Sequence, residues 1–169
     1  RPADNQGMRD QYSGGSGWDT LRLEMSAADW TLYQADVVEL MQFLAGARRD
    51  GKGEVNSGRH GQFVLELGTA KVSLDKIDNL MVVVDGVEQV IPVAPSIQRG
   101  EFEAEVREGG RLVDSGRIAF VDLNLADTHT VSTALVGADP ALGTLTVTLT
   151  EDSTGDGLGR LDWSYTLDD

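Results

Sequence analysis

The stretch that most constrains this chain covers residues 118–130, IAFVDLNLADTHT. Its first four residues are apolar and mostly β-branched or aromatic, which predicts a short strand. Asp122, Asn124 and Asp127 follow at spacings of two and three residues. Oxygen-bearing side chains packed this densely repel one another unless a cation lies among them, and Ca2+ takes about six to eight oxygen ligands. The stretch therefore predicts a calcium site, with a solvated strand-to-turn loop as the alternative.

The charge of the chain supports a cation rather than an anionic partner. The 169 residues include 28 acidic and 14 basic side chains, so the net charge is −14 and nucleic acid is not an expected partner. From residue 118 onward nine carboxylates face a single basic residue, Arg160. This part of the chain repels itself without counter-ions, and calcium relieves that repulsion. There is no cysteine, so disulfides cannot supply the cross-links.

Two further segments contain candidate ligands. Residues 14–22, GGSGWDTLR, fit the nonapeptide G-G-x-G-x-D-x-U-x, in which glycines allow a tight turn while backbone carbonyls and Asp19 bind calcium. Only one copy is present, so a plain glycine-rich turn is the alternative. Residues 151–159, EDSTGDGLG, place Asp152 and Asp156 four residues apart in a second acidic loop, or in a plain hairpin. We interpret His129 as packing beside the first site, since calcium prefers oxygen.

The last third of the chain resembles a known family. Within residues 115–168, the phrases F-x-D-x-N-x-x-D-x-H-T, G-T-L and W-x-Y occur in one order, and together they resemble the VCBS repeat, an extracellular module of large bacterial surface proteins. Asn124 departs from the Asp usual in that family. The nonapeptide resembles an RTX repeat, and the phrase NLMVVVDGV resembles a region adjacent to such repeats. The resemblance implies a secreted bacterial adhesin at the cell surface or in biofilms, and Glu105 as a further calcium ligand.

Periodicity predicts a mainly β chain with two parts. Residues 1–95 form a β-rich part with one amphipathic helix at residues 27–45, which begins at a capping box of Ser26 and Asp29. Residues 1–13 read as an irregular lead-in, and Pro92 and Pro95 mark a boundary near residues 92–98. Strands are expected at residues 20–25, 62–68, 71–74, 81–84 and 87–93. We expect part of residues 1–95 to pack against or pair with the sheet that follows.

Beyond the boundary, residues 96–169 contain five strand-sized runs separated by turn signals. This spacing predicts an antiparallel sandwich of immunoglobulin or cadherin type. The runs are residues 101–107, 116–121, 128–135, 143–150 and 159–167. A polar loop at residues 47–61 carries Arg48, Arg49, Lys52 and Arg59, and it is either a mobile surface loop or a contact for an acidic partner.

The expected function is structural. No nucleophile motif, phosphate-binding loop or metalloprotease motif is present, so we expect no enzyme. We expect a calcium-stiffened extender module of a large secreted RTX-type adhesin, monomeric, with neighbouring domains of the same polypeptide as partners. One alternative is a calcium-dependent module that binds a cell-surface sugar or peptide through Trp18, Trp163 or the basic loop. Another is an accessory domain of a secreted hydrolase. No apolar run reaches the length of a membrane span, so no membrane insertion is expected.

Overall fold

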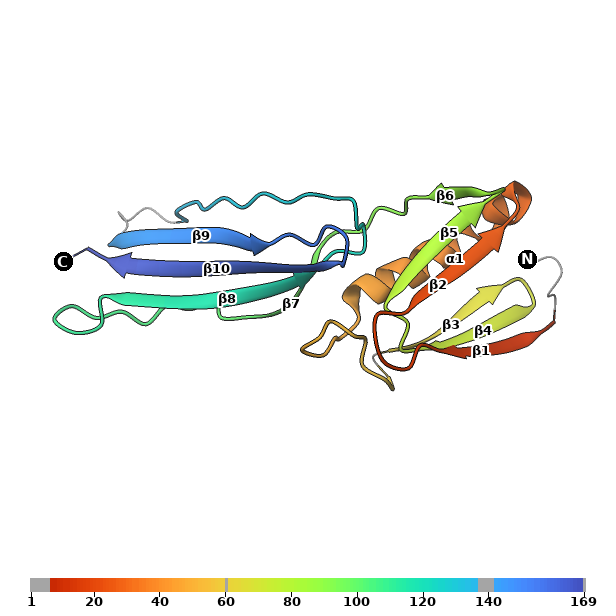
Figure 1. Cartoon of the computed structure of the whole chain (residues 1–169), viewed down its shortest axis with the longest axis horizontal. Helices are drawn as coiled ribbons and strands as arrows, with labels where there is room; N and C mark the ends of the chain where they lie inside the picture. The colour runs from red at the N-terminus through yellow and green to blue at the C-terminus, as the bar shows by residue number, and fades with distance from the viewer. Residues whose placement is uncertain (1–6, 60, 137–141, 169) are drawn as a thin grey trace. The chain divides into compact units, whose positions relative to one another are not determined.

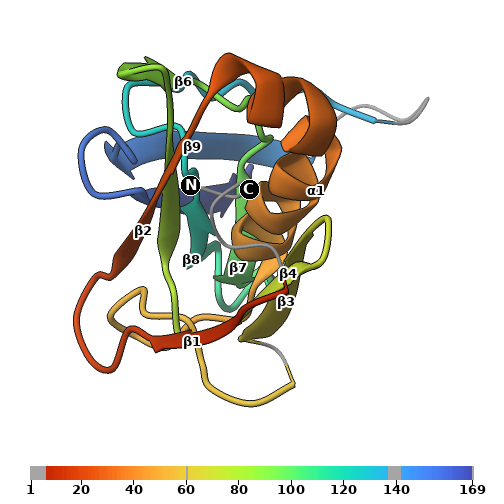
Figure 2. The ribbon, with the colours of Figure 1, turned by 90° about the vertical axis from the view of Figure 1, so that its right-hand side faces the viewer.

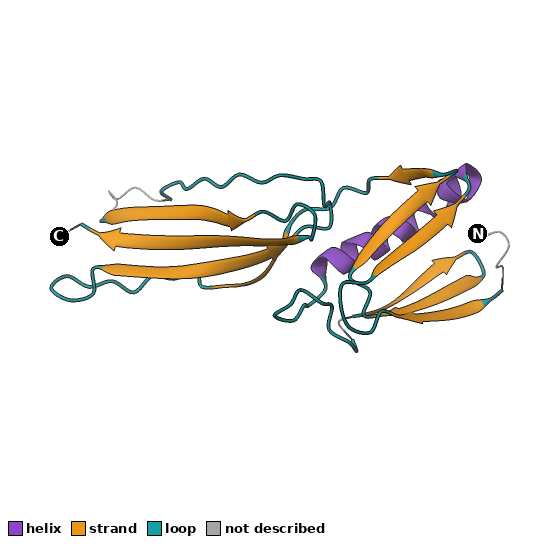
Figure 3. Cartoon of the chain, viewed as in Figure 1, coloured by secondary structure: helices purple, strands orange, loops and turns teal. Residues whose placement is uncertain are grey.

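The computed structural model describes residues 7–59, 61–136 and 142–168. The chain divides into two compact units, Arg1–Ala94 and Pro95–Asp169. The division falls inside the boundary segment predicted at residues 92–98. The described elements are ten strands and one helix (Figures 1 and 3). The prediction of a mainly β chain with one helix in its N-terminal part is therefore confirmed.

The N-terminal unit contains two three-stranded sheets, in the orders β1-β4-β3 and β2-β5-β6. Strand β1 runs parallel to β4 and β2 runs parallel to β5, while β3 and β6 pair in antiparallel fashion with β4 and β5. The elements are β1 (Arg9–Ser13), β2 (Thr20–Met25), α1 (Ala27–Gly46), β3 (Gln62–Leu67), β4 (Ala70–Asp75), β5 (Asn79–Val84) and β6 (Val87–Gln89).

Helix α1 packs against β3 and β5 and supplies much of the core of this unit (Figure 2). It begins where the capping box predicts, because Asp29 N donates to Ser26 Oγ while Ser26 N donates back to Asp29 Oδ2. Its buried apolar residues recur at three- and four-residue steps and meet buried leucines and valines of the strands. These core residues are Val37, Leu40, Met41, Leu44, Leu65, Leu67, Leu80 and Val82.

The two parallel pairings correct the sequence analysis. Residues 9–13 were expected to be irregular, yet they form β1 because β4 offers them a parallel partner, in register from Arg9 beside Lys71 to Ser13 beside Asp75. After the turn that follows β1, strand β2 pairs with β5, again in parallel. The turn at residues 14–19 consequently lies against residues 75–79. Gly14 N donates to Asp75 O at 3.1 Å, and Asp78 N donates to Asp19 O at 2.8 Å.

A buried ion pair fixes this turn. Arg49 and Asp78 have side chains only 1% exposed and approach to 3.4 Å. Asp78 Oδ1 accepts from Val55 N at 2.6 Å, and Asp78 Oδ2 accepts from Asp19 N at 2.8 Å. Burial lowers the pKa of Arg49 to about 10, partly offset by the charge of Asp78, so the guanidinium stays protonated at neutral pH. The expectation that Arg49 belongs to an exposed basic loop is therefore wrong, because Asp78 holds it inside the unit.

The C-terminal unit is a four-stranded antiparallel sheet in the order β7-β8-β10-β9. The strands are β7 (Ser96–Gly100), β8 (Val113–Val121), β9 (Gly143–Glu151) and β10 (Leu158–Leu167). Residues 101–107 and 128–135, both expected to be strands, join no ladder, whereas β7 occupies part of the expected boundary segment. All four strands come from residues 96–167, so no described strand of residues 1–95 joins this sheet.

One face of this sheet is apolar and only partly covered. Leu161 lies between Ile118 and Leu149 in the register, and Trp163 lies between Gly116 and Val147. An apolar hollow of about 210 Å³ separates this face from residues 129–131. A sandwich needs a second sheet over the apolar face, and among the described residues only extended segments lie beyond the four strands. The sheet itself is thus established, while a sandwich of immunoglobulin type is not confirmed.

The Arg49–Asp78 pair generates a stability prediction. Replacing Asp78→Ala leaves Arg49 charged, buried and unpaired and removes the acceptor for Val55 N and Asp19 N. A change of this kind costs about 3–5 kcal/mol, so we expect a large fall in the urea midpoint. The matched control is Glu66→Ala, which breaks the exposed Lys71–Glu66 pair and should cost less than about 1 kcal/mol. Similar midpoints for the two variants would contradict a structural role for Asp78.

Candidate functional site

The two acidic loops predicted separately from the sequence form one structure, which we call the acidic junction (residues 122–129 and 151–157). Val121 at the end of β8 lies opposite Leu158 at the start of β10, so both loops leave the sheet at the same end. Three hydrogen bonds join them: Asp122 N to Gly157 O at 3.0 Å, Gly155 N to Leu125 O at 2.8 Å, and Thr154 Oγ1 to Asp127 O at 2.8 Å.

His129 lies at the centre of the acidic junction, between two carboxylates. Its Nε2 is 3.0 Å from Asp122 Oδ2, and its Nδ1 is 2.9 Å from Asp152 Oδ1. Ser153 Oγ lies 3.3 Å from the same Nδ1, and the edge of the His129 ring packs against Phe120 with centroids 5.2 Å apart. The imidazole therefore occupies the space between the acidic side chains, where the sequence analysis expected a cation.

The protonation of His129 follows from this geometry. A neutral imidazole donates from one nitrogen only, whereas an imidazolium donates to both carboxylates. The hydrogen bond with Asp152 raises the pKa of His129, the bond and charge of Asp122 add to this effect, and desolvation opposes it. The hydrogen bond from His129 correspondingly lowers the pKa of Asp152. A raised pKa favours the imidazolium, which is the form that donates to both carboxylates.

The expected ligands have different positions. Asp122 and Asn124 are buried, at 1% and 8% exposure, and Asn124 N donates to Asp122 Oδ1 at 2.8 Å. Asp127 and Asp156 have exposed side chains at the rim, where Asp156 Oδ1 accepts from Leu158 N at 3.0 Å. Asp152 lies within the acidic junction beside His129. All five residues therefore lie near one end of the sheet. Only Asp122, Asn124 and Asp152 lie within the acidic junction.

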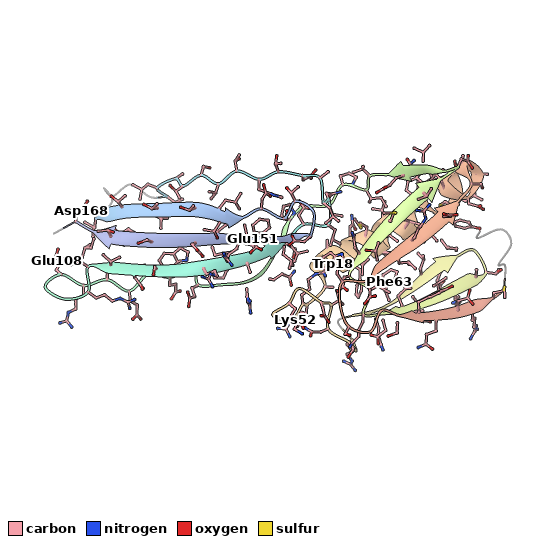
Figure 4. All side chains as sticks on the ribbon, in the orientation of Figure 1. Trp18, Lys52, Phe63, Glu108, Glu151 and Asp168 are labelled. Atoms are coloured by element: carbon pink, nitrogen blue, oxygen red, sulfur yellow. The ribbon has the colours of Figure 1, made fainter. Side chains whose placement is uncertain are left out.

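Glu105 and Asp19 lie elsewhere. Glu105 N donates to Asp114 Oδ2, near the start of β8, whereas Asp122 follows the last residue of that strand. A strand rises about 3.3 Å per residue, so roughly 20 Å or more separates Glu105 from the acidic junction. Glu108 and Glu151 likewise lie at opposite ends of this unit (Figure 4). Glu105 therefore lies too far from Asp122 to share a calcium ion with it, and its role as a ligand stays a prediction. Asp19 belongs to the N-terminal unit.

The acidic junction does not have the donor arrangement of a metal site. All four carboxylate oxygens of Asp122 and Asp152 already have hydrogen-bond partners, three of them atoms of His129. Across the described ranges, no group of three or more His, Asp or Glu side chains is placed to hold a metal ion. A calcium ion bound between Asp122 and Asp152 would have to displace His129, so these residues fit such an ion poorly.

The glycine-rich turn of the N-terminal unit has a different donor set. A Cβ on Gly14 would lie 2.8 Å from Asp19 Cγ and 2.1 Å from the carbonyl oxygen of Lys76. Any other residue at this position would therefore clash with both groups, so only glycine allows the Asp19 carboxylate to lie close to this carbonyl. Asp75 adjoins the same turn, because its carbonyl accepts from Gly14 N. Lys76 Nζ donates to Gly15 O at 3.1 Å and bonds to neither carboxylate.

Two carboxylate oxygens at this turn are buried and accept no hydrogen bond from the described residues. They are Asp19 Oδ2 and Asp75 Oδ1. Buried polar atoms are paired in the great majority of cases, and leaving one unpaired costs about 1–3 kcal/mol. The nonapeptide predicts Asp19 as a ligand, whereas no sequence motif contains Asp75, which only the parallel pairing of β1 with β4 brings to the turn.

Comparison with protein-family models, with curated proteins and with solved structures gives no match. The resemblance to VCBS and RTX repeats therefore rests on the sequence phrases alone. In the described part of the chain, no helix combines the length and apolar character needed to cross a membrane.

The His129 bridge predicts a pH dependence of stability. A raised folded-state pKa means that its contribution is complete below the ordinary value of 6.5 and is lost as the pH rises through the folded value. The lowered pKa of Asp152 preserves the bridge down to pH values below 3.8. We expect the melting temperature of the C-terminal unit to fall as the pH rises above the ordinary value of 6.5. In His129→Gln this slope should flatten, and an unchanged slope would contradict the bridge.

Proposed function

We propose that this chain is a non-catalytic structural module that calcium stabilises at the glycine-rich turn of its N-terminal unit. The observation that carries the proposal is the pair of buried, unpartnered carboxylate oxygens on Asp19 and Asp75. A carboxylate oxygen in this position has neither a hydrogen-bond donor nor the solvation that water would give it. A divalent cation relieves both effects at once, and hard oxygen donors of this kind favour Ca2+ over softer metals.

The backbone around the turn suits the same ion. Calcium sites combine carboxylates with backbone carbonyls and water in flexible geometries, and Gly14 allows the Asp19 carboxylate to lie close to Lys76 O. Asp19 and Asp75 would hold the ion. The neighbouring Asp78 keeps Asp19 in position through its bond to Asp19 N, and it is itself neutralised by Arg49. The proposed calcium site at the glycine-rich turn is therefore a different site from the one that the sequence predicts at Asp122.

The polar groups of the C-terminal unit support a structural role over catalysis. Ser153, His129 and Asp122 contact one another in the order that a nucleophile, a base and an orienting carboxylate adopt in hydrolases. Ser153, however, is 0% exposed, and its hydroxyl shares Nδ1 of His129 with Asp152. A nucleophile without exposed surface cannot meet a substrate. The acidic junction therefore acts as an internal tie between two loops.

The setting we propose is extracellular. Calcium reaches the millimolar range outside cells, where modules with dissociation constants of about 10⁻⁴–10⁻³ M are occupied. The chain has no cysteine, so metal binding is the available substitute for disulfide cross-links. Together with the VCBS-like and RTX-like phrases, this supports an extender module of a large secreted bacterial adhesin, with neighbouring domains of the same polypeptide as partners.

Thermal melting with calcium and with EDTA tests this proposal. A dissociation constant of about 10⁻⁴–10⁻³ M gives roughly 1.5–3 kcal/mol of stabilisation at 10 mM Ca2+, so we expect the N-terminal unit to melt several degrees higher. Asp19→Asn and Asp75→Asn should each abolish the shift. Neither variant should lower the melting temperature in EDTA, because each keeps the shape of the side chain and removes the charge of a carboxylate whose buried oxygen has no partner among the described residues.

Asp122→Asn is the matched control. It should lower the melting temperature of the C-terminal unit by weakening the bond to His129, while the calcium shift of the N-terminal unit persists. A shift that disappears in Asp122→Asn and persists in Asp19→Asn would restore the site expected from the sequence. No shift in the wild-type chain would refute calcium stabilisation altogether.

A second candidate function has its own observation. A hollow of about 680 Å³ on the C-terminal unit is lined by both charges, with Arg99 and Arg117 beside Glu101 and Asp162. Such a surface suits a sugar or a polar peptide. Of the aromatic side chains first considered for this role, Trp163 also lines the hollow and donates to Glu101 O at 2.6 Å. Trp18 lies in the N-terminal unit, where its ring is 5.2 Å from the Arg49 guanidinium.

Binding measured at saturating calcium separates this candidate from the extender. If the hollow binds a ligand, glycan or peptide arrays should show hits that Arg117→Ala weakens at least several-fold, while Arg107→Ala, a change outside the hollow, leaves them intact. Arrays without hits, or hits equally sensitive to both changes, would dismiss the hollow as a binding site.

A further inference from the structure

The free edge of β9 differs from every other described edge. In the sheet order β7-β8-β10-β9, strands β7 and β9 are at the edges. Strand β7 has five residues, a register shift and Arg99, all of which discourage further pairing. Strand β9 has nine residues, and positions 143–150 carry no charge and no proline. The edge strands of the N-terminal unit are three residues long (β6) or contain charged residues (β1, β2, β3).

The ladder shows which backbone groups of β9 face outward. Asp168 N donates to Leu142 O at 3.0 Å, and these two residues continue the β10–β9 register by one position. Hydrogen-bonded pairs alternate along an antiparallel ladder, so the even-numbered residues of β9 are the ones that bond with β10. The backbone groups of Leu145, Val147 and Leu149 therefore point away from β10. No hydrogen bond from another described segment reaches them, and the strand is largely exposed, including Leu145 at 45%.

The sequence of this edge is its own mirror image. Residues 144–150 read TLTVTLT, which is palindromic about Val147. In an antiparallel pair centred on Val147, leucine meets leucine, threonine meets threonine and valine meets valine. The outward-facing backbone groups at positions 145, 147 and 149 then form hydrogen-bonded pairs with those of the second copy. The direction of the free backbone groups and the palindromic side chains therefore both place the centre of the pairing at Val147. Cross-strand pairs of this kind each contribute about 0.2–1 kcal/mol.

We propose that the edge of β9 is the docking surface for a second copy of this chain. The two β9 strands pair in antiparallel fashion about a two-fold axis at Val147, which extends the four-stranded sheet into one sheet shared by two chains. The contact is isologous, so it closes as a dimer. Leu145, Val147 and Leu149 of both copies continue the apolar face across the axis. This dimer goes beyond the proposed function and replaces the monomer expected from the sequence.

Charge argues for this register over an offset one. The net charge of −14 opposes association of two copies in general. With the axis at Val147, Glu151 lies beside Gly143 of the second copy, and the two Glu151 side chains are about 26 Å apart at 3.3 Å per residue. This distance exceeds the Debye length of about 8 Å at physiological salt. Sliding the strands so that their C-terminal ends approach would bring the acidic loops together.

Sedimentation velocity of the full chain over a wide concentration range tests the proposal. We expect a concentration-dependent species of about twice 18.2 kDa that strengthens as salt is raised. The variant T146K/T148K places lysine against lysine across the axis, since position 146 meets position 148 of the second copy, and it should remain at 18.2 kDa. The variant T146E/T148K places glutamate against lysine and should dimerise at least as well as the wild type.

These two variants are matched controls for each other. Both change only exposed threonines, and Thr148 lies beside Asp162 of β10, where lysine is compatible with the monomer. T146K/T148K also lowers the net charge from −14 to −12, so generic repulsion predicts stronger association for it, opposite to the register prediction. A third variant, Val147→Pro, removes an outward N–H without touching the β10 ladder and should abolish the dimer.

Two outcomes would overturn the proposal. One is a wild-type chain that stays at 18.2 kDa at the highest concentration and salt. The other is equal association of T146K/T148K and T146E/T148K with unchanged circular dichroism, which would place the contact elsewhere.

Discussion

The N-terminal unit depends on one buried carboxylate, that of Asp78. It bonds to Val55 N, 23 residues away, to Arg49, 29 residues away, and to Asp19 N, 59 residues away. These three partners belong to the loop after α1 and to the glycine-rich turn, neither of which has a regular hydrogen-bonding ladder of its own. Because a buried carboxylate is tolerated only when its oxygens are satisfied, Asp78 holds both segments in one arrangement around itself.

The same constraint explains how an acidic chain without cysteine handles its carboxylates. Asp78 is neutralised by Arg49, and Asp122 and Asp152 share His129 as a partner. Asp19 and Asp75 each keep one buried oxygen without a hydrogen-bond partner among the described residues, and the nearby Lys76 bonds to a carbonyl instead. We therefore propose the glycine-rich turn, rather than the acidic junction, as the place where an external cation binds.

Local signals predicted local structure well. The capping box located the start of α1, and the gap between the expected strands 81–84 and 87–93 is the β5–β6 turn, where Asp85 and Gly86 adopt positive φ. Strand β1 was missed because its residues, RDQYS, have no apolar alternation and become a strand only beside β4. Residues 101–107 and 128–135 were predicted as strands from their local pattern, and they form none because no neighbouring strand pairs with them.

The candidate site was predictable to a similar degree. Spacing identified Asp122, Asn124 and Asp152, and the nonapeptide identified Asp19, because each lies within a short motif. The role of His129 could not be read from the sequence, since Asp152 lies 23 residues away and meets it only through the pairing of β8 with β10. Asp75 had no signal at all before the parallel pairing was known. Motifs thus located candidate groups, and the topology decided which of them lack a partner.

Terbium luminescence sensitised by tryptophan tests the central claim most directly. Tb3+ replaces Ca2+ at oxygen sites, and Trp18 immediately precedes Asp19 in the glycine-rich turn. The account predicts sensitised emission that Ca2+ displaces, that disappears in Asp19→Asn and in Trp18→Phe, and that persists in Asp122→Asn. Absence of emission from the wild-type chain, or emission that survives the loss of the Asp19 carboxylate, would contradict it.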